Sequence, residues 1–250
     1  MMKTLVSAAA VVATSAGVAN AAILYQTSFE APTFNATLNG VDGWITQGGG
    51  TVGSTAGAAR TGTRYVQSAN LNTSGQWQWQ GAIAQSAASI AAAPIIKASV
   101  WLAHVAGTST ALRRGGLQMY DSTGGTIFAA LYIQSDGSIT ATDGTGTSYS
   151  TAAGAVVNPS AYNQVEIELN YTTQLATFRV NGATLTLPSG AGTFVGTDFG
   201  DADFFSIRGS GTTGGSSVRY DDYVVEQIPA PGAFALLGLG GLIAGRRRRA

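Results

Sequence analysis

The sequence predicts an all-β fold, a two-sheet antiparallel jelly-roll sandwich, and three observations support this class. Residues 22–227 contain short β-prone runs in which apolar and polar side chains alternate. Gly, Asn, Asp and Ser separate these runs, and Asn181-Gly182 has the form of a two-residue hairpin turn. The same region has no convincing amphipathic helix. Roughly eleven or twelve strands are therefore expected, which suits two sheets about 10 Å apart.

In chain order, the expected strands are residues 23–29, 64–67, 76–80, 95–104, 117–120, 127–134, 138–142, 164–171, 175–180, 183–187, 204–208 and 217–226. Within 95–104, alternation places Val100 on one side and Lys97 and Trp101 on the other. Residues 82–93 are either a short helix or a loop or crossover strand. The Gly-, Ser- and Thr-rich stretches 48–62 and 143–154 are predicted to be surface loops.

Both ends of the chain are predicted to lie outside the sandwich, which leaves 22–227 as one domain. Residues 1–21 have the form of a signal peptide. Lys3 precedes an apolar stretch, and Ala19-Asn20-Ala21 gives the small-x-small pattern that signal peptidase cleaves. The chain is therefore expected to be exported and to lose this segment.

The C-terminal segment 228–250 combines a Pro-x-Pro motif, an apolar run and an arginine cluster. As a helix of about 12 residues the run spans roughly 18 Å, short of the ~30 Å hydrocarbon core, so it is a marginal membrane anchor. The motif residues are Pro229, Pro231, Arg246, Arg247, Arg248 and Arg249. This order resembles the PEP-CTERM sorting signal, with Ala230 where that family has glutamate. The resemblance implies transient or permanent membrane anchoring, an exosortase-like processing enzyme and delivery to the cell surface or extracellular matrix.

The body of the chain resembles the concanavalin A-like lectin/glucanase domains, including the laminin-G-like ones. Four short features carry this resemblance: residues 28–32 after the first strand, Asp42-Gly43-Trp44, the 164–187 meander, and Tyr220-Asp221-Asp222-Tyr223 in the last strand. That family contains glycosidases, lectins and adhesion modules, so the resemblance implies a fold without choosing a function.

Charge and composition exclude several kinds of function. Without the two end segments, 8 basic residues remain against 13 acidic ones, a net charge of −5. An acidic body does not suit a nucleic-acid partner. The chain has no cysteine, and His104 is its single histidine, which excludes disulfides, a Cys-His nucleophile pair and a histidine-rich zinc site.

Carboxylate spacing argues against catalysis. Glu166-Ile167-Glu168 is the nearest match to the Glu-x-Asp-x-x-Glu strand of laminarinase-type glucanases, but Asn170 and Tyr171 follow where a third carboxylate is needed. A Glu-x-Glu pair on the polar side of a strand is more often a solvated face. We therefore expect a non-catalytic domain, with a degenerate glycoside hydrolase as the weaker alternative.

Trp77 and Trp79 are the candidate carbohydrate-binding residues, with Gln78 between them. Both tryptophans lie on one face of their predicted strand. If that face is exposed, the pair is a sugar platform with glutamine amides beside it; if it faces the other sheet, which is the commoner arrangement, both are core. Trp44 and Trp101 are predicted to support the core or a loop.

Acidic residues suggest one possible metal site. Glu30 ends the first predicted strand and Asp222 lies in the last, so antiparallel pairing of these strands would bring two oxygen ligands together for a structural Ca²⁺. Asp198, Asp201 and Asp203 form a second acidic segment, which we interpret as a plain turn.

The function expected from these observations is a structural or adhesive role at the cell surface or in the extracellular matrix. A lectin-like module that binds exopolysaccharide is the alternative.

Overall fold

The computed structural model describes residues 21–48, 51–69, 75–105, 112–150, 155, 157–208 and 217–230. All but the last residue of the predicted signal peptide and all but the first three residues of the predicted sorting tail lie outside this part of the chain. Within it, no helix has both the length and the apolar character to cross a bilayer.

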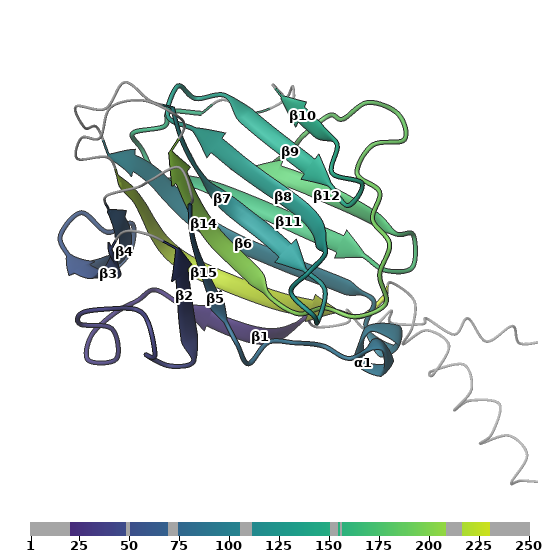
Figure 1. The fold of residues 1–250 in the computed structure, drawn as a ribbon, viewed down its shortest axis with the longest axis horizontal. Coiled ribbons are helices and arrows are strands. Elements are labelled where there is room, and N and C mark those ends of the chain that lie inside the picture. The colour runs from purple at the N-terminus through teal and green to yellow at the C-terminus, as the bar shows by residue number, and fades with distance from the viewer. Residues whose placement is uncertain are drawn as a thin grey trace, which may run out of the picture.

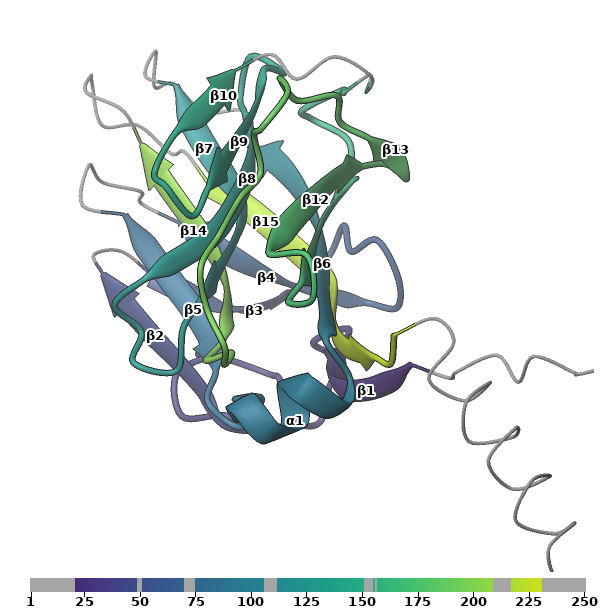
Figure 2. The same cartoon turned by 90° about the vertical axis from the view of Figure 1, so that its right-hand side faces the viewer.

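Two antiparallel sheets packed face to face form the molecule, as the side view shows (Figures 1 and 2). The eight-stranded sheet runs in the order β13 (Ala183–Thr184), β12 (Leu175–Val180), β11 (Asn163–Asn170), β6 (Ile95–Val105), β15 (Ser217–Ile228), β4 (Arg64–Ala69), β3 (Thr51–Ala56), and β1 (Ala22–Thr27) also pairs with β15. The seven-stranded sheet runs in the order β10 (Ser148–Ser150), β9 (Ile139–Asp143), β8 (Ile127–Gln134), β7 (Arg113–Tyr120), β14 (Ala202–Arg208), β5 (Gln76–Gln80), β2 (Trp44–Gly48). The predicted all-β sandwich is confirmed.

The core lies between the sheets and is built by alternation along each strand. In β11, Val165, Ile167 and Leu169 are fully buried, while the residues between them face outward. Rings from both sheets meet near one end, where Trp44 lies 5.1 Å from Phe204 and 5.1 Å from Tyr223 between ring centroids. Burial of such rings supplies most of the driving force for packing the two layers.

Three local predictions are resolved or corrected. Residues 51–56, predicted to be loop, form strand β3 against β4, because small polar side chains suit a partly exposed strand at the border of a sheet. Ser148–Ser150, also predicted to be loop, pairs with β9 as β10. The ambiguous stretch 82–93 contains the short helix α1 (Ala87–Ala92), whose first turn is capped by the Ser86 hydroxyl.

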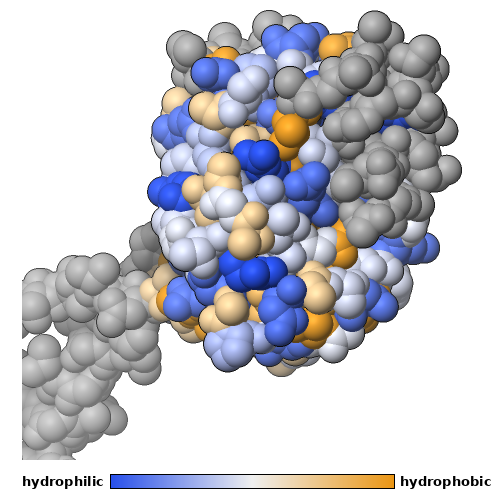
Figure 3. Space-filling model, turned by 90° about the vertical axis from the view of Figure 1, so that its left-hand side faces the viewer, coloured by the Kyte–Doolittle hydropathy of each residue, from blue (hydrophilic) through white to orange (hydrophobic). Residues whose placement is uncertain are grey.

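Predicted turn chemistry is confirmed at the hairpin between β12 and β13. Asn181 and Gly182 have φ values of 52° and 78°, the left-handed pair that a type I′ turn requires. On the side where β2 and β3 lie, at the left of Figure 1, the surface mixes hydrophilic and neutral residues with small hydrophobic spots (Figure 3).

Candidate functional site

Strand β5 presents its two tryptophans to the outside of the seven-stranded sheet. Gln78 pairs with Phe204, a core residue, so the glutamines of β5 face the other sheet. Trp77 pairs with Phe205 one position along, on the opposite side, and both Trp77 and Trp79 are half-buried. Of the two orientations that the sequence allowed, the outward one is adopted, with both rings half-buried.

An aromatic row crosses this outer face. Trp77 in β5, Phe205 in β14, Gly116 in β7 and Tyr132 in β8 are successive partners in the sheet. Gly116 is required because a Cβ atom there would lie 2.0 Å from the Leu131 carbonyl oxygen. With no side chain at Gly116, the rings of Phe205 and Tyr132 meet edge to face with centroids 5.9 Å apart.

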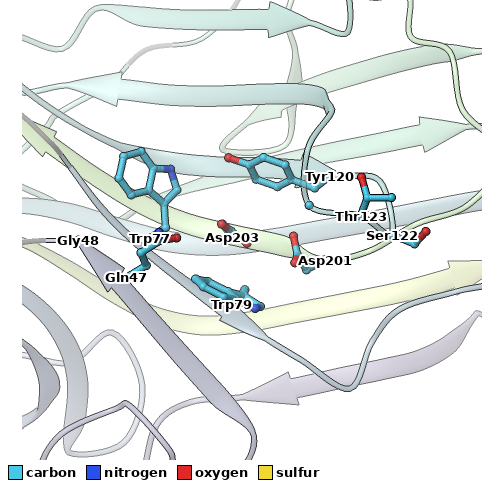
Figure 4. A pocket seen from close by; sticks show the side chains of 10 residues that line it. Gln47, Gly48, Trp77, Trp79, Tyr120, Ser122, Thr123, Asp201 and Asp203 are labelled. Atoms are coloured by element: carbon cyan, nitrogen blue, oxygen red, sulfur yellow. The ribbon is translucent and has the colours of Figure 1, made fainter.

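A pocket of about 650 Å³ opens beside the tryptophans (Figure 4). Its lining includes Gln47, Trp77, Trp79, Tyr120, Asp201 and Asp203. We call it the tryptophan pocket. Figure 4 shows the carboxyl groups of Asp201 and Asp203 between the ring of Tyr120 and that of Trp79. Aromatic walls and a polar floor are the combination that binds sugars, whose faces carry C–H groups and whose edges carry hydroxyls.

Gln118 holds two of the aromatic side chains in place. Its Oε1 atom accepts hydrogen bonds from Trp77 Nε1 at 2.7 Å and from the Tyr120 hydroxyl at 2.8 Å. A platform whose rings are already oriented loses less side-chain entropy when a ligand binds.

A second pocket of about 480 Å³ adjoins the first and shares Trp77 with it. Arg114 and Tyr132 line this pocket, and the Arg114 guanidinium lies 5.2 Å from the centroid of the Tyr132 ring. We call it the arginine pocket. The two pockets together make one side of the sandwich a continuous stretch of aromatic and polar groups.

The electrostatics of the tryptophan pocket are dominated by Asp201 and Asp203. Burial, and then the charge of Asp201, raise the pKa of Asp203 well above its ordinary value. Burial also raises the pKa of Asp201, with a smaller contribution from the charge of Asp121. The two carboxyl groups influence each other's protonation, so the pair titrates as a unit. Burial and these carboxyl groups also raise the pKa of Tyr120.

Two sequence predictions about this region need correction. Gln78 does not belong to the platform, because it is fully buried on the inner face and neither atom of its amide group has a hydrogen-bond partner. Asp203 is not a turn residue: it lies in β14, which begins at Ala202 rather than at the predicted residue 204, and it is 6% exposed. Because β14 starts two residues before the predicted strand, Asp203 lies within it, on the same face as Phe205.

The remaining acidic candidates lie elsewhere. Glu166 and Glu168 are on the outer face of the eight-stranded sheet, where Arg179 approaches them at 2.7 and 3.0 Å. The Arg179 guanidinium therefore balances the charge of these two carboxylates. Trp101 lies on the same face under Arg60, whose guanidinium is 3.7 Å from the ring centroid, so it supports a loop as predicted.

Glu30 and Asp222 are brought together, as the sequence predicted, because β1 pairs with β15. Both line one pocket of about 600 Å³. However, Glu30 accepts hydrogen bonds from Thr63 and Arg64, and Asp222 is paired with the Arg60 guanidinium at 2.5 Å. The oxygens of both carboxylates are thus engaged by protein donors, whereas Ca²⁺ takes six to eight oxygen ligands. No group of three metal-ligating acids or histidines occurs in the described part of the chain, and the calcium prediction stays untested.

Comparisons with known proteins support the fold alone. No protein-family model matches the chain, and a search of curated proteins finds no match. Among solved structures, the chain resembles the cellulose induced protein Cip1, with a TM-score of 0.57, 15% identity, and coverage of 80% of this chain and 96% of that one. It also resembles a carbohydrate esterase from the Shiga toxin-encoding bacteriophage phi24B, with a TM-score of 0.52, 14% identity, and coverage of 84% and 100%. A sialidase matches with a TM-score of 0.51 and 11% identity over 73% of this chain, which spans 17% of that protein's length.

Proposed function

We propose that this protein is a lectin-like carbohydrate-binding module that binds polysaccharide through the outer face of its seven-stranded sheet. The observation that carries the proposal is the placement of Trp77 and Trp79 on that face, over a pocket with carboxyl and amide groups. The neighbours named as sialidase and carbohydrate esterase act on carbohydrates, which agrees with this class.

The binding mode follows from the geometry of the tryptophan pocket. A pyranose ring placed against Trp79 or Trp77 covers its apolar face, while Gln47 and the two aspartates reach the hydroxyl groups at its edge. The arginine pocket extends the site toward a second sugar unit, so an extended chain suits the surface better than a monosaccharide.

A non-catalytic role is part of the proposal. Glycosidase carboxylates stand about 5–5.5 Å apart in retaining enzymes and about 6.5–9.5 Å apart in inverting ones. Glu166 and Glu168 are both paired with Arg179 on the opposite side of the molecule, so they do not supply a free nucleophile and a free acid. In this proposal Asp201 and Asp203 serve ligand binding, and each carboxyl group influences the protonation of the other.

The proposed setting is the cell surface or extracellular matrix. The support for it is the signal-peptide pattern of residues 1–21 and the PEP-CTERM-like tail 228–250. A module delivered there would adhere to the matrix by binding its polysaccharide, so the proposed function includes the adhesive role expected from the sequence.

Replacing the platform tests the binding site directly. In Trp77→Ala and Trp79→Ala variants, retention on insoluble or immobilised polysaccharide is expected to fall by about tenfold or more, because each ring supplies roughly 1.5–3 kcal/mol of buried contact. The measurement is affinity electrophoresis or a pull-down against a panel of neutral and charged polysaccharides.

The matched control is Trp101→Ala, the same substitution on the outer face of the other sheet. It should leave retention unchanged. If all three variants bind as the unmodified protein does, or all three lose binding equally, the tryptophan pocket is not the binding site.

A further inference from the structure

The tryptophan pocket carries negative charge that no basic side chain balances among the described residues lining it. Asp201 and Asp203 supply two carboxyl groups to its floor. Arg114, the cation of the neighbouring arginine pocket, is paired with the Tyr132 ring instead. Asp203 is buried and Asp201 is half-buried; a buried carboxyl group without a basic partner is costly for the folded protein, which is a reason to look for its partner in a ligand.

Asp203 gives an independent reason to expect that a ligand of this pocket carries a hydrogen-bond donor. The residue is 6% exposed, and its Oδ1 atom has no hydrogen-bond partner in the described structure. A buried acceptor without a donor costs about 1–3 kcal/mol. A ligand that brings a donor to the pocket floor would recover part of that penalty, by bonding to the pair directly or after a small shift of the side chain.

The walls of the pocket favour a positively charged donor. The rings of Trp79 and Tyr120 stand on either side of the carboxyl pair (Figure 4). Aromatic faces attract cations through their quadrupole, and the attraction is greatest where the cation is desolvated. A carboxylate floor between aromatic walls therefore selects an ammonium group over a neutral hydroxyl and strongly against an anion.

We infer that the tryptophan pocket binds an amino sugar with a free ammonium group, held between Trp79 and Tyr120 with its nitrogen on the Asp201–Asp203 pair. The inference rests on the proposed glycan-binding function and specifies the sugar class that this pocket takes. The adjoining arginine pocket, with Arg114 and Tyr132, would hold the next unit of the chain.

Three tetrasaccharides of one backbone test the inference: β-1,4-linked glucosamine, its N-acetylated form and the glucose tetramer. They differ at one substituent of each ring. Measured by isothermal titration calorimetry at about pH 6, where an amine is protonated, the glucosamine tetramer is expected to bind at least about tenfold more tightly than the other two.

The decisive variant is Asp201→Asn with Asp203→Asn, which removes the charge and keeps the shape. It should bind all three tetrasaccharides equally. The matched control, Glu168→Gln with Glu226→Gln, removes two charges from the outer face of the other sheet and should keep the preference, which separates a built pocket from general attraction of a polycation to an acidic protein. If the double aspartate variant does not fold, the single Asp201→Asn variant is expected to reduce the preference for the glucosamine tetramer without abolishing it, because the Asp203 carboxyl group remains; an unchanged preference would count against the inference.

The outcomes separate the two claims. Equal binding of all three tetrasaccharides by the unmodified protein, or a preference that survives removal of both aspartates, overturns the amino-sugar inference. If binding is then still lost in Trp79→Ala, the carbohydrate-binding function stands with a different ligand. If no tetrasaccharide and no polysaccharide binds, both the function and the inference fail.

Discussion

Asp203 illustrates how a single residue links stability to binding. Its carboxyl group is buried beside that of Asp201, in a position that a strand interior normally gives to an apolar residue. Residues of this kind persist where they serve a ligand, at a cost to the free protein. The consequence is a pH dependence that can be measured without knowing the ligand.

Replacement of Asp203 by Asn is expected to raise the melting temperature increasingly as the pH rises. The folded-state pKa of Asp203 is raised, so the stability it contributes is present below the unfolded value of 3.8 and is lost as the pH rises through the folded value. Asn does not titrate, and its amide can still donate to Asp201. The other groups facing it, Tyr120, Tyr223 and Asp121, are common to both proteins.

The measurement is the difference in melting temperature between variant and parent from about pH 4 to pH 8. Each kcal/mol of relieved penalty corresponds to about 2–4 °C in a domain of this size. Asp136→Asn is the control of opposite sign. The hydroxyl and backbone N–H of Ser138 lower the pKa of Asp136 below 3.8, so the cost of its replacement should be nearly constant above about pH 5 and should shrink as the pH falls below about 4, a range that a scan down to about pH 2 covers. A difference for Asp203→Asn that stays flat or shrinks with pH would show that its carboxyl group is not held protonated.

At the scale of elements, a β-bulge in β15 decides which of its side chains face the core and which hold a neighbouring loop. Its pairing with β6 shifts register between Asp221 and Val224, and Asp222 has a φ of 46°. The bulge lets Tyr220 and Tyr223 both face the core and leaves Asp221 buried under the segment 57–63. Asp221 there accepts backbone hydrogen bonds from Arg60, Thr61 and Asp222.

Asp221→Ala is expected to release the segment 57–63. Three backbone N–H groups would lose their acceptor, which costs about 1–3 kcal/mol. In the unmodified protein the Arg60 side chain is stacked on Trp101 and paired with Asp222. Release of the segment would free this side chain, and trypsin could then cleave after Arg60. Limited proteolysis with identification of the cleavage site by mass spectrometry is the readout.

Asp136→Ala serves as the comparison for the segment 57–63, because it removes a similar local acceptor from the exposed hairpin between β8 and β9. It should leave cleavage at Arg60 unchanged. Unaltered trypsin resistance in Asp221→Ala would mean that the stacking on Trp101 holds the segment without the carboxylate.

At the scale of the molecule, the two outer faces differ in character. The eight-stranded sheet is covered by ion pairs among Lys97, Glu166, Glu168, Arg179 and Glu226 and by the segment over Trp101. The seven-stranded sheet carries the two pockets and the aromatic row. A sandwich with one closed and one open face suits a protein held at a surface with its binding face turned toward polymer.

The proposed export and sorting predict a definite mass for the mature protein. Protein recovered from cells should lack residues 1–21, and it should lack the arginine cluster at 246–249 if the tail is removed as in PEP-CTERM proteins. Intact-mass spectrometry of surface and culture fractions measures both. Recovery of the full tail from the culture fluid would contradict removal, and recovery of residues 1–21 would contradict export by the signal peptide.

Much of the fold was predictable because strand alternation and turn chemistry are local. The grouping of side chains on the two faces of residues 95–104 and the turn at Asn181-Gly182 followed from residue order alone. Strand β3 was missed because Gly, Ser and Thr between 51 and 56 carry a weak β signal, and its pairing with β4 is decided by contacts that the local sequence does not encode.

The candidate site was only partly predictable. Trp77 and Trp79 were found because they share a strand face, but alternation cannot say whether that face is inner or outer. Asp203 was missed because the start of β14 was placed two residues late, and its proximity to Tyr120 on β7 is a matter of sheet order.

The sequence by itself determined most of the strands, the hairpin turn at Asn181-Gly182 and the absence of cysteine chemistry, since each depends on residues close together in the chain. Tertiary structure decided which side of β5 meets solvent, which acids share a pocket and which are neutralised by arginine. The physical reason is that burial and charge pairing depend on neighbours from other strands, and strand order brings together residues as distant in sequence as Trp77 and Asp203.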